Sequence, residues 1–212
     1  MKKIAYNCGD VGYFNDGRIE TDNCNLNNKL KKILSKNEIL SMEEIQKLIS
    51  PIISKCDVFI SYSHKDENIA KYIAYELMKK GKNVFFDYLY WGNMDDALKI
   101  YDDKNCKKDD GYYSYEERNK STSLFHMILV DSIWKTIESC KTFILIKTQN
   151  SSILEKTYSP WIYLEVEIVN RLNSEKASFL EHYDSKNKIT FPLKLNGFVE
   201  IDSMQELINT II

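Results

Sequence analysis

The feature that most constrains the fold is an alternation of short apolar runs with amphipathic segments, which begins at residue 57. DVFISY (57–62) has the length and composition of a buried parallel strand. The next segment, DENIAKYIAYELMKKG, places apolar residues at helical spacing between Asp66 and Gly81, which is typical of a helix that ends at a glycine. NVFFDY (83–88) follows as a second strand. Together the three pieces predict a βαβ unit.

The same alternation continues through the rest of the chain. The patterns predict a short helix at 95–101, a helix at 123–140, a strand at 141–148, a helix from Ser159 to about Leu172, strands at 189–195 and 198–201, and a closing helix at 203–212. Strands that alternate with helices predict an α/β fold in which helices cover both faces of the sheet.

Two segments do not follow this alternation. Residues 1–55 contain an Asp-Gly turn in FNDGRI (14–19) and a capping box in SMEEIQKLIS (41–50). These signals predict a small folded N-terminal extension, a hairpin plus helices, ahead of an α/β domain at 56–212. Residues 102–120 hold six acids and five bases with little to bury, which predicts an exposed insertion within that domain.

Composition narrows the classes of function. The net charge of −2 gives no reason to expect a nucleic acid or an anionic membrane as partner. No apolar run approaches the roughly 18 residues that a membrane span needs, and the opening MKKIAYNCGDVGYF lacks the apolar region of a secretory signal. The five cysteines are scattered without C-x-x-C spacing, so we expect free thiols in the cytoplasm and no bound metal.

The stretch SPWIYLEVEI (159–168) raises a question about burial. Ser159 and Pro160 suit the cap and first position of a helix. Glu167 is expected to face water and pair with Arg171 at i+4. Glu165, in contrast, lies within the apolar stripe of the same helix, where an ionised carboxylate without a partner is costly. Judged on this pattern alone, Glu165 is either a functional carboxylate or a residue at the helix edge paired with a lysine.

Four stretches occur in the order and spacing of one known family. They are CDVFISYSHKDENIAKYIAYEL, VFFDYLYWG, IWKTIESCKTFILIKT and SPWIYLEVEI. Together they resemble the TIR domain (Toll/interleukin-1 receptor type), and SPWIYLEVEI resembles the family's S-x-W-x-x-x-E-[LIV] helix start. The match covers about residues 56 to 212. It implies a flavodoxin-like sheet of five parallel strands between helices.

The resemblance also implies an activity for Glu165. In catalytic TIR domains the Glu four residues after this Trp carries cleavage of NAD+, with release of nicotinamide. Breaking the nicotinamide–ribose bond builds positive charge on C1 of the ribose, and a poorly solvated carboxylate stabilises such a cation better than one in water. Nicotinamide leaves as a neutral molecule, so no acid is needed, unlike in ordinary glycosidases. NAD+ is then the substrate, and no further cofactor is implied.

The resemblance places further residues at the substrate. Trp161 lies one turn before Glu165 and is expected to line the nicotinamide or ribose pocket, although core packing is the simpler reading of a tryptophan at this spacing. The loop that follows the first strand is expected to meet the substrate through Ser61, Tyr62, Ser63 and His64. Family members often carry arginines here, whereas this chain has Ser63 and His64. Asp87 and Gly92 fit the loop after the second strand, which a neighbouring copy often contributes to the site.

Three functions remain open on the sequence. The first is an NAD+ glycohydrolase or ADP-ribosyl cyclase of bacterial immunity, as in Thoeris-type anti-phage systems, which self-associates and makes a signal for a separate effector protein. The second is a non-catalytic adaptor that acts through TIR–TIR association. The third is an enzyme similar to the nucleoside deoxyribosyltransferases, which share the fold and would accept free nucleosides. The identity of the product (linear, cyclic or conjugated) does not follow from the sequence.

Overall fold

The computed structural model describes residues 1–8, 56–86, 94–173, 182–183 and 189–212. They divide into two compact units. The sheet unit comprises the described residues up to Phe86 and those from Thr136 onward, and the helical unit comprises 94–135. The predicted hairpin at 14–19 and helix at 41–50 lie outside the described residues.

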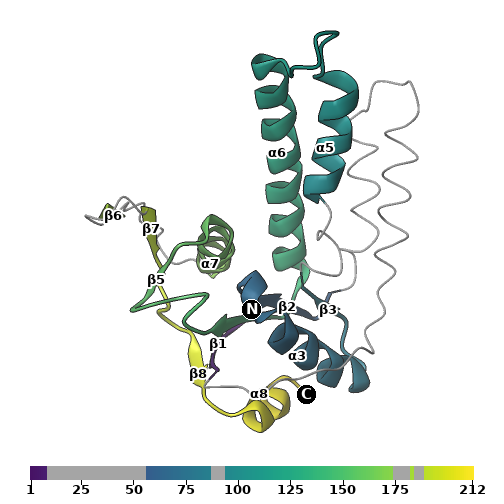
Figure 1. The fold of residues 1–212 in the computed structure, drawn as a ribbon. Helices are drawn as coiled ribbons and strands as arrows, with labels where there is room; N and C mark the ends of the chain where they lie inside the picture. The colour runs from purple at the N-terminus through teal and green to yellow at the C-terminus, as the bar shows by residue number, and fades with distance from the viewer. Residues whose placement is uncertain (9–55, 87–93, 174–181, 184–188) are drawn as a thin grey trace. The chain divides into compact units, whose positions relative to one another are not determined.

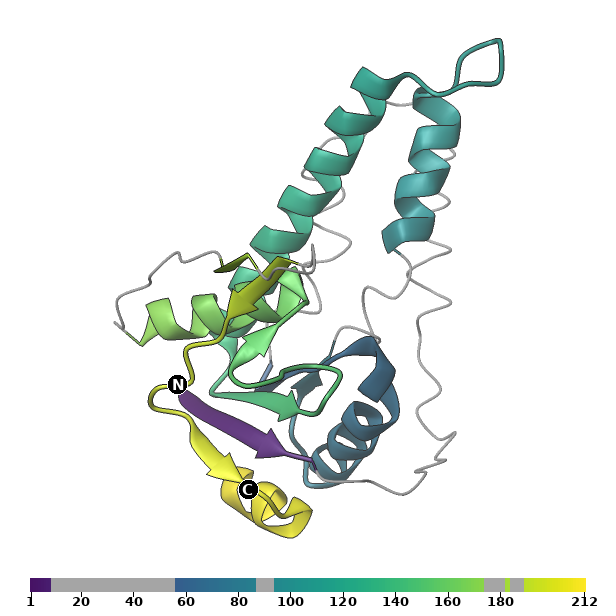
Figure 2. The same ribbon diagram turned by 60° about the vertical axis from the view of Figure 1, so that its left-hand side comes forward.

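A five-stranded parallel sheet forms the centre of the sheet unit, with the strand order β3-β2-β4-β1-β8 (Figures 1 and 2). Its strands are β1 (Lys2–Asn7), β2 (Val58–Ser61), β3 (Val84–Phe85), β4 (Thr142–Lys147) and β8 (Val199–Ile201). Thr142, the first residue of β4, pairs with Lys2 on one side and with Val58 on the other. The predicted α/β class and the parallel sheet of five strands are confirmed.

The position of β1 differs from the pattern read in the sequence. Residues 1–55 are expected to precede the domain, whereas Lys2–Asn7 lies inside the sheet, parallel to both β4 and β8. Ile4 and Ala5 are fully buried. Lys3 is also buried, and its Nζ donates to the carbonyl of Asn196 at 2.8 Å. The strand was not evident in the sequence because its short apolar run follows two lysines, which usually mark an exposed segment.

The segment expected as the fourth strand of the sheet lies elsewhere. β7 (Ile189–Pro192) pairs antiparallel with β5 (Lys156–Thr157) and with β6 (His182–Tyr183) in a separate small sheet. The prediction that 189–195 joins the central sheet is therefore wrong. β1 occupies the place between β4 and β8, and Pro192 has no N–H to donate to a second ladder.

Among the described residues, three helices cover the central sheet. α3 (Glu67–Lys79) and α8 (Met204–Ile211) lie side by side on one face, and α7 (Pro160–Leu172) lies on the other (Figures 1 and 2). A short 3-10 turn, η2 (His64–Asp66), leads into α3. α3 ends as the sequence predicts, because Gly81 takes a φ of 77°, a left-handed conformation that other residues rarely adopt.

The helical unit, described by itself, contains α5 (Met94–Asn105) and most of α6 (Tyr115–Ser139). α6 begins eight residues before the helix predicted at 123. Ser114 explains this start, since its Oγ accepts a hydrogen bond from the backbone N–H of Glu117 at 3.4 Å. Ser114 is therefore a helix N-cap, a signal that the acidic composition of 102–120 obscured.

Within the described ranges, no helix is long and apolar enough to cross a membrane.

The buried position of β1 gives a first testable prediction. Replacing Ile4 by alanine should lower the free energy of unfolding by about 2–5 kcal/mol, because the side chain is fully buried and a cavity would remain. Val199→Ala is the matched control: Val199 pairs with Ile4 but is half-exposed, so the change should be within about 0.5 kcal/mol. Urea unfolding of the full chain measures both. Equal midpoints for Ile4→Ala and the parent would contradict the central position of β1.

Candidate functional site

The helix that carries Glu165 starts at a defined cap. The Oγ of Ser159 accepts a hydrogen bond from the backbone N–H of Ile162 at 3.3 Å, and Pro160 takes the first helical position, as the sequence predicts. The backbone N–H of Ser159 in turn donates to Thr157 Oγ1 at 3.0 Å, which connects the cap to β5. These contacts determine where α7 begins and place Glu165 in its second turn.

Glu165 is buried and hydrogen-bonded to a second residue of the predicted site. Its side chain is 7% exposed, and its Oε2 accepts a hydrogen bond of 2.5 Å from the Oγ of Ser61. This distance is in the range of a hydroxyl that donates to an ionised carboxylate. Ser61 is buried at the carboxyl end of β2. The structure thus joins two predicted site residues that are 104 positions apart in the sequence.

The face of the sheet beneath α7 explains why this bond is shielded from water. Side chains alternate along a strand, so Ser61 lies on the same face as Phe59. The ring of Phe59 stacks on Phe85 and Phe143, with centroid separations of 5.1 and 5.5 Å. Ser61 is therefore a polar residue that lies next to a layer of aromatic rings, at the carboxyl edge of the sheet.

Two connecting loops are tied together at the same edge. Asp66, which is buried, accepts hydrogen bonds from Thr148 Oγ1 at 2.5 Å and from Asn150 Nδ2 at 2.7 Å. These bonds join the start of α3 to the loop after β4. β2 and β4 are neighbours whose connections lead to opposite sides of the sheet, toward β3 and β8 respectively. Such a switch point, at the carboxyl ends of the strands, is where open α/β sheets bind ligands.

The other predicted site residues that the structure describes range from buried to exposed. Tyr62 is buried, with its ring 6.3 Å from that of Phe86, and its edge meets the ring of the exposed His64 at 6.4 Å. Ser63 and Trp161 are half-buried. Asp87 and Gly92 lie outside the described residues.

Glu167 departs from its predicted surroundings. It is only 6% exposed, so the expectation that it faces water is wrong. The small sheet supplies the reason, because α7 contacts β5 and β7 in addition to lying on the central sheet. Among the described residues, no hydrogen-bond partner is found for its Oε2. The residues that form β7 lie well beyond the end of α7 in the sequence, so helical periodicity could not reveal this burial.

Two further polar residues, which the sequence did not single out, lie near Asp66. Cys8 follows β1, and its side chain is close enough to that of Tyr6 for each to affect the pKa of the other. Burial raises the pKa of Tyr6 to about 12, with a smaller contribution from Cys8. Burial also raises the pKa of the Cys8 thiol, and the negative charge of Asp66 adds to this. Cys8 is therefore a neutral thiol at physiological pH, which argues against a nucleophilic role.

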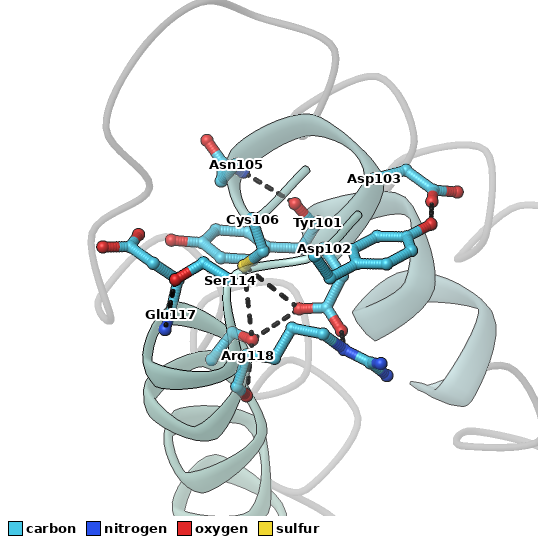
Figure 3. A network of polar contacts seen from close by, with 10 residues as sticks. Tyr101, Asp102, Asp103, Asn105, Cys106, Ser114, Glu117 and Arg118 are labelled. Atoms are coloured by element: carbon cyan, nitrogen blue, oxygen red, sulfur yellow. Dashed lines mark hydrogen bonds and ion pairs between the residues drawn. The ribbon is translucent and has the colours of Figure 1, made fainter. Parts of the chain in front are cut away.

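A second polar cluster lies in the helical unit and joins α5 to α6 (Figure 3). The buried Asp102 accepts hydrogen bonds from Ser121 Oγ at 2.5 Å and from Arg118 Nε at 3.0 Å. Cys106 donates to the same carboxylate at 3.5 Å, and burial raises the pKa of its thiol. Arg118 also lies over the ring of Tyr113, 5.1 Å from its centroid. Because these groups satisfy one another, we interpret the cluster as a structural clasp.

Comparison with family models, curated proteins and solved structures finds no match to this chain. Among the described residues, no group of three or more His, Cys, Asp or Glu side chains is arranged to hold a metal ion.

The Ser61–Glu165 contact predicts an effect on stability. Ser61→Ala removes the hydroxyl donor from a buried carboxylate and should lower the free energy of unfolding by about 1–3 kcal/mol. Ser63→Ala is the matched control, since Ser63 is half-buried and makes no capping hydrogen bond, and its effect should be within about 0.5 kcal/mol. Chemical denaturation compares the two. If both variants behave alike, the hydrogen bond contributes nothing measurable.

The clasp gives a prediction for the helical unit. Asp102→Asn keeps the size of the side chain but removes the charge that faces Arg118, so we expect a loss of about 1–3 kcal/mol in stability. Asp109→Asn, in the exposed turn nearby, should be neutral within about 0.5 kcal/mol. Denaturation followed by far-ultraviolet circular dichroism reports the loss of helix. Identical curves for the two variants would argue against a clasp.

Proposed function

We propose that this chain is an NAD+-cleaving enzyme of the TIR type, in which Glu165 promotes breakage of the nicotinamide–ribose bond. The observation that carries the proposal is the buried Glu165 carboxylate, oriented by the Ser61 hydroxyl at the carboxyl edge of a parallel sheet. Burying an ionised carboxylate costs free energy, so acidic residues are usually exposed. A site that stabilises a cationic transition state would account for a buried one at this position.

The chemistry follows from the charge that develops in the substrate. As the bond to nicotinamide breaks, positive charge builds on C1 and the ring oxygen of the ribose. The attraction of a carboxylate for this charge is about four times stronger at an effective dielectric constant of about 20 than in bulk water. Glu165 is almost entirely removed from solvent, so its negative charge would be poorly screened from a ribose bound beside it.

Ser61 would serve to position the carboxylate. Its hydrogen bond to Oε2 restricts rotation of the Glu165 carboxyl group before substrate arrives. A carboxylate that is already oriented loses less entropy and reorganises less when the transition state forms. No proton donor is required, because nicotinamide departs as a neutral molecule.

The strand order supports the TIR interpretation of the fold. If β2 is counted as the first strand of the domain, the order β3-β2-β4 corresponds to 2-1-3 of a flavodoxin-like sheet. The last strand, β8, is at the edge, as strand 5 would be. The fourth place is held by β1 instead of a strand that follows α7. The proposal is thus a flavodoxin-like TIR sheet in which an N-terminal strand replaces strand 4.

Further features of the proposed function rest on the family resemblance. The enzyme would act in the cytoplasm, associate with copies of itself, and release an ADP-ribose product, linear or cyclic, that a separate effector protein senses. The nucleophile that captures the ribose cation decides which product forms. Water would give ADP-ribose, and an adenine nitrogen of the same molecule would give a cyclic product.

One observation favours the second candidate, a non-catalytic adaptor that acts through TIR–TIR association. The turn between β4 and α7 exposes apolar side chains, and Leu154 at its tip is 91% exposed. Leu154 and Glu155 both have positive φ, 48° and 56°, which residues with side chains rarely adopt. Strain of this kind often accompanies a functional surface. An adaptor would need such a surface and would make no use of the charge on Glu165.

Glu165→Gln tests the enzymatic proposal directly. The variant keeps the size of the side chain and an oxygen that can accept from Ser61, but it removes the negative charge. We expect the parent to release nicotinamide from NAD+ and the variant to be slower by about 100-fold or more. Mass-resolved chromatography of the reaction, at low and high protein concentration, measures nicotinamide and identifies the second product.

Glu138→Gln is the matched control, because Glu138 is exposed near the end of α6 and should not affect the rate. Free nucleosides, supplied without NAD+, test the deoxyribosyltransferase-like alternative. A parent protein that leaves NAD+ intact at every concentration, or a Glu165→Gln variant as active as the parent, would count against the proposed enzyme. Loss of association in Leu154→Ser with intact NAD+ throughout would favour the adaptor.

A further inference from the structure

Two cysteines, far apart in the sequence, lie opposite each other at the amino ends of β2 and β4. The register pairs Val58 with Thr142, and the backbone N–H groups of Lys141 and Thr142 both donate to the carbonyl of Asp57. Continuing this register by two residues sets Cys56 opposite Cys140.

The two thiols are in contact and shielded from solvent. Cys56 is 8% exposed and Cys140 is 5% exposed. The two side chains are close enough for Cys56 to raise the pKa of Cys140, and Cys56 Sγ donates to the carbonyl of Val58 at 3.2 Å. Both are free thiols, as are Cys8 and Cys106. Opposite residues on neighbouring strands have Cα atoms about 5 Å apart, which is within the range that a disulfide bridges.

We propose that Cys56 and Cys140 are a redox modification site, at which a peroxide converts the two thiols to a reversible disulfide. The other described cysteines have no such partner position: Cys106 lies in the helical unit, where it contacts Asp102 and Ser121, and Cys8 lies at the carboxyl end of β1. Neither is a neighbour of Cys56 or Cys140 in the strand register. The pairing is therefore specific among the described residues.

The reaction balances with hydrogen peroxide as the oxidant. The thiolate sulfur of Cys56 attacks one peroxide oxygen, the O–O bond breaks, and a sulfenic acid and water form once a proton is taken up. The sulfur of Cys140 then displaces hydroxide from the sulfenic sulfur and forms the S–S bond, and its own proton completes the second water. In total, two thiols and one peroxide give one disulfide and two waters, with two electrons passing from sulfur to oxygen.

The position of the pair predicts what the bond would do. Cys56 and Cys140 lie at the amino edge of the sheet, whereas Ser61 and Glu165 meet at the carboxyl edge. A disulfide would close the chain between β2 and β4 into a covalent loop that includes the whole of residues 94–135. Such a long loop loses much of its freedom in the unfolded state, so oxidation should raise the thermal midpoint.

Burial sets the rate at which the bond forms. The neighbouring Cys56 side chain and the burial of the thiol both raise the pKa of Cys140, so little Cys140 thiolate is present at neutral pH. Cys56 is the more exposed of the two, at 8% against 5%, so we expect it to react first and Cys140 to resolve the sulfenic acid. We also expect the overall reaction to be slower than oxidation of an exposed cysteine.

The experiment treats the native full chain with hydrogen peroxide, blocks the remaining thiols, and maps cross-linked peptides by mass spectrometry without reduction. The expected result is a peptide pair joining Cys56 to Cys140, lighter by two hydrogen atoms and split by dithiothreitol, together with a higher thermal midpoint of the oxidised protein. Cys106→Ser is the matched control and should give the same cross-link. Cys140→Ser should abolish it and leave a sulfenic acid at Cys56 that dimedone traps.

Two outcomes would overturn the proposal. One is oxidation of Cys8 to completion with no Cys56–Cys140 peptide. The other is pairing of Cys56 with several cysteines at similar yield, in the native protein as in urea, which would mean that the fold does not direct the bond. Both outcomes are read in the parent protein, so they do not depend on whether a cysteine variant folds.

Discussion

The pairing of β4 on both of its edges is the constraint on which the rest of the sheet unit depends. β4 forms parallel ladders with β1 and with β2, and β1 in turn pairs with β8. A parallel sheet of this kind must be covered on both faces, because its strands are apolar on both sides. α7 covers one face, and α3 with α8 covers the other. The positions of α3, α7 and α8 therefore follow from the pairing of the strands that they cover.

The candidate site is a consequence of this arrangement. The parallel register brings Ser61 to the carboxyl edge, and the crossover after β4 returns the chain over the Ser61 face as α7. Glu165 meets Ser61 there, removed from water on a layer of stacked aromatic rings. A buried carboxylate with a hydroxyl donor is oriented and poorly screened, which are the two properties that stabilisation of a ribose cation requires. The thiol pair lies at the opposite edge, so the two sites can act independently.

Local sequence patterns predicted the bounds of helices better than they predicted which strands pair in the sheet. The apolar spacing of α3, its stop at Gly81, and the Ser159–Pro160 start of α7 all follow from interactions within a few residues, and the structure has each of them. The N-cap at Ser114 was equally readable, but the charge of its surroundings suggested an exposed loop. β1 was missed for a different reason. A run of three apolar residues beside two lysines has no periodicity long enough to distinguish a core strand from an exposed end.

The sequence by itself determined the α/β class, the bounds of most helices, and the presence of a carboxylate within an apolar stripe four residues after Trp161. Only the tertiary structure decided that Lys2–Asn7 lies between β4 and β8, that Ser61 donates a hydrogen bond to Glu165, and that Glu167 is also buried. Helix periodicity and caps arise from contacts between residues near each other in the chain, so a short stretch of sequence is enough to predict them. Strand pairing uses backbone groups that are the same in every residue, so the order of strands depends on how the whole chain packs.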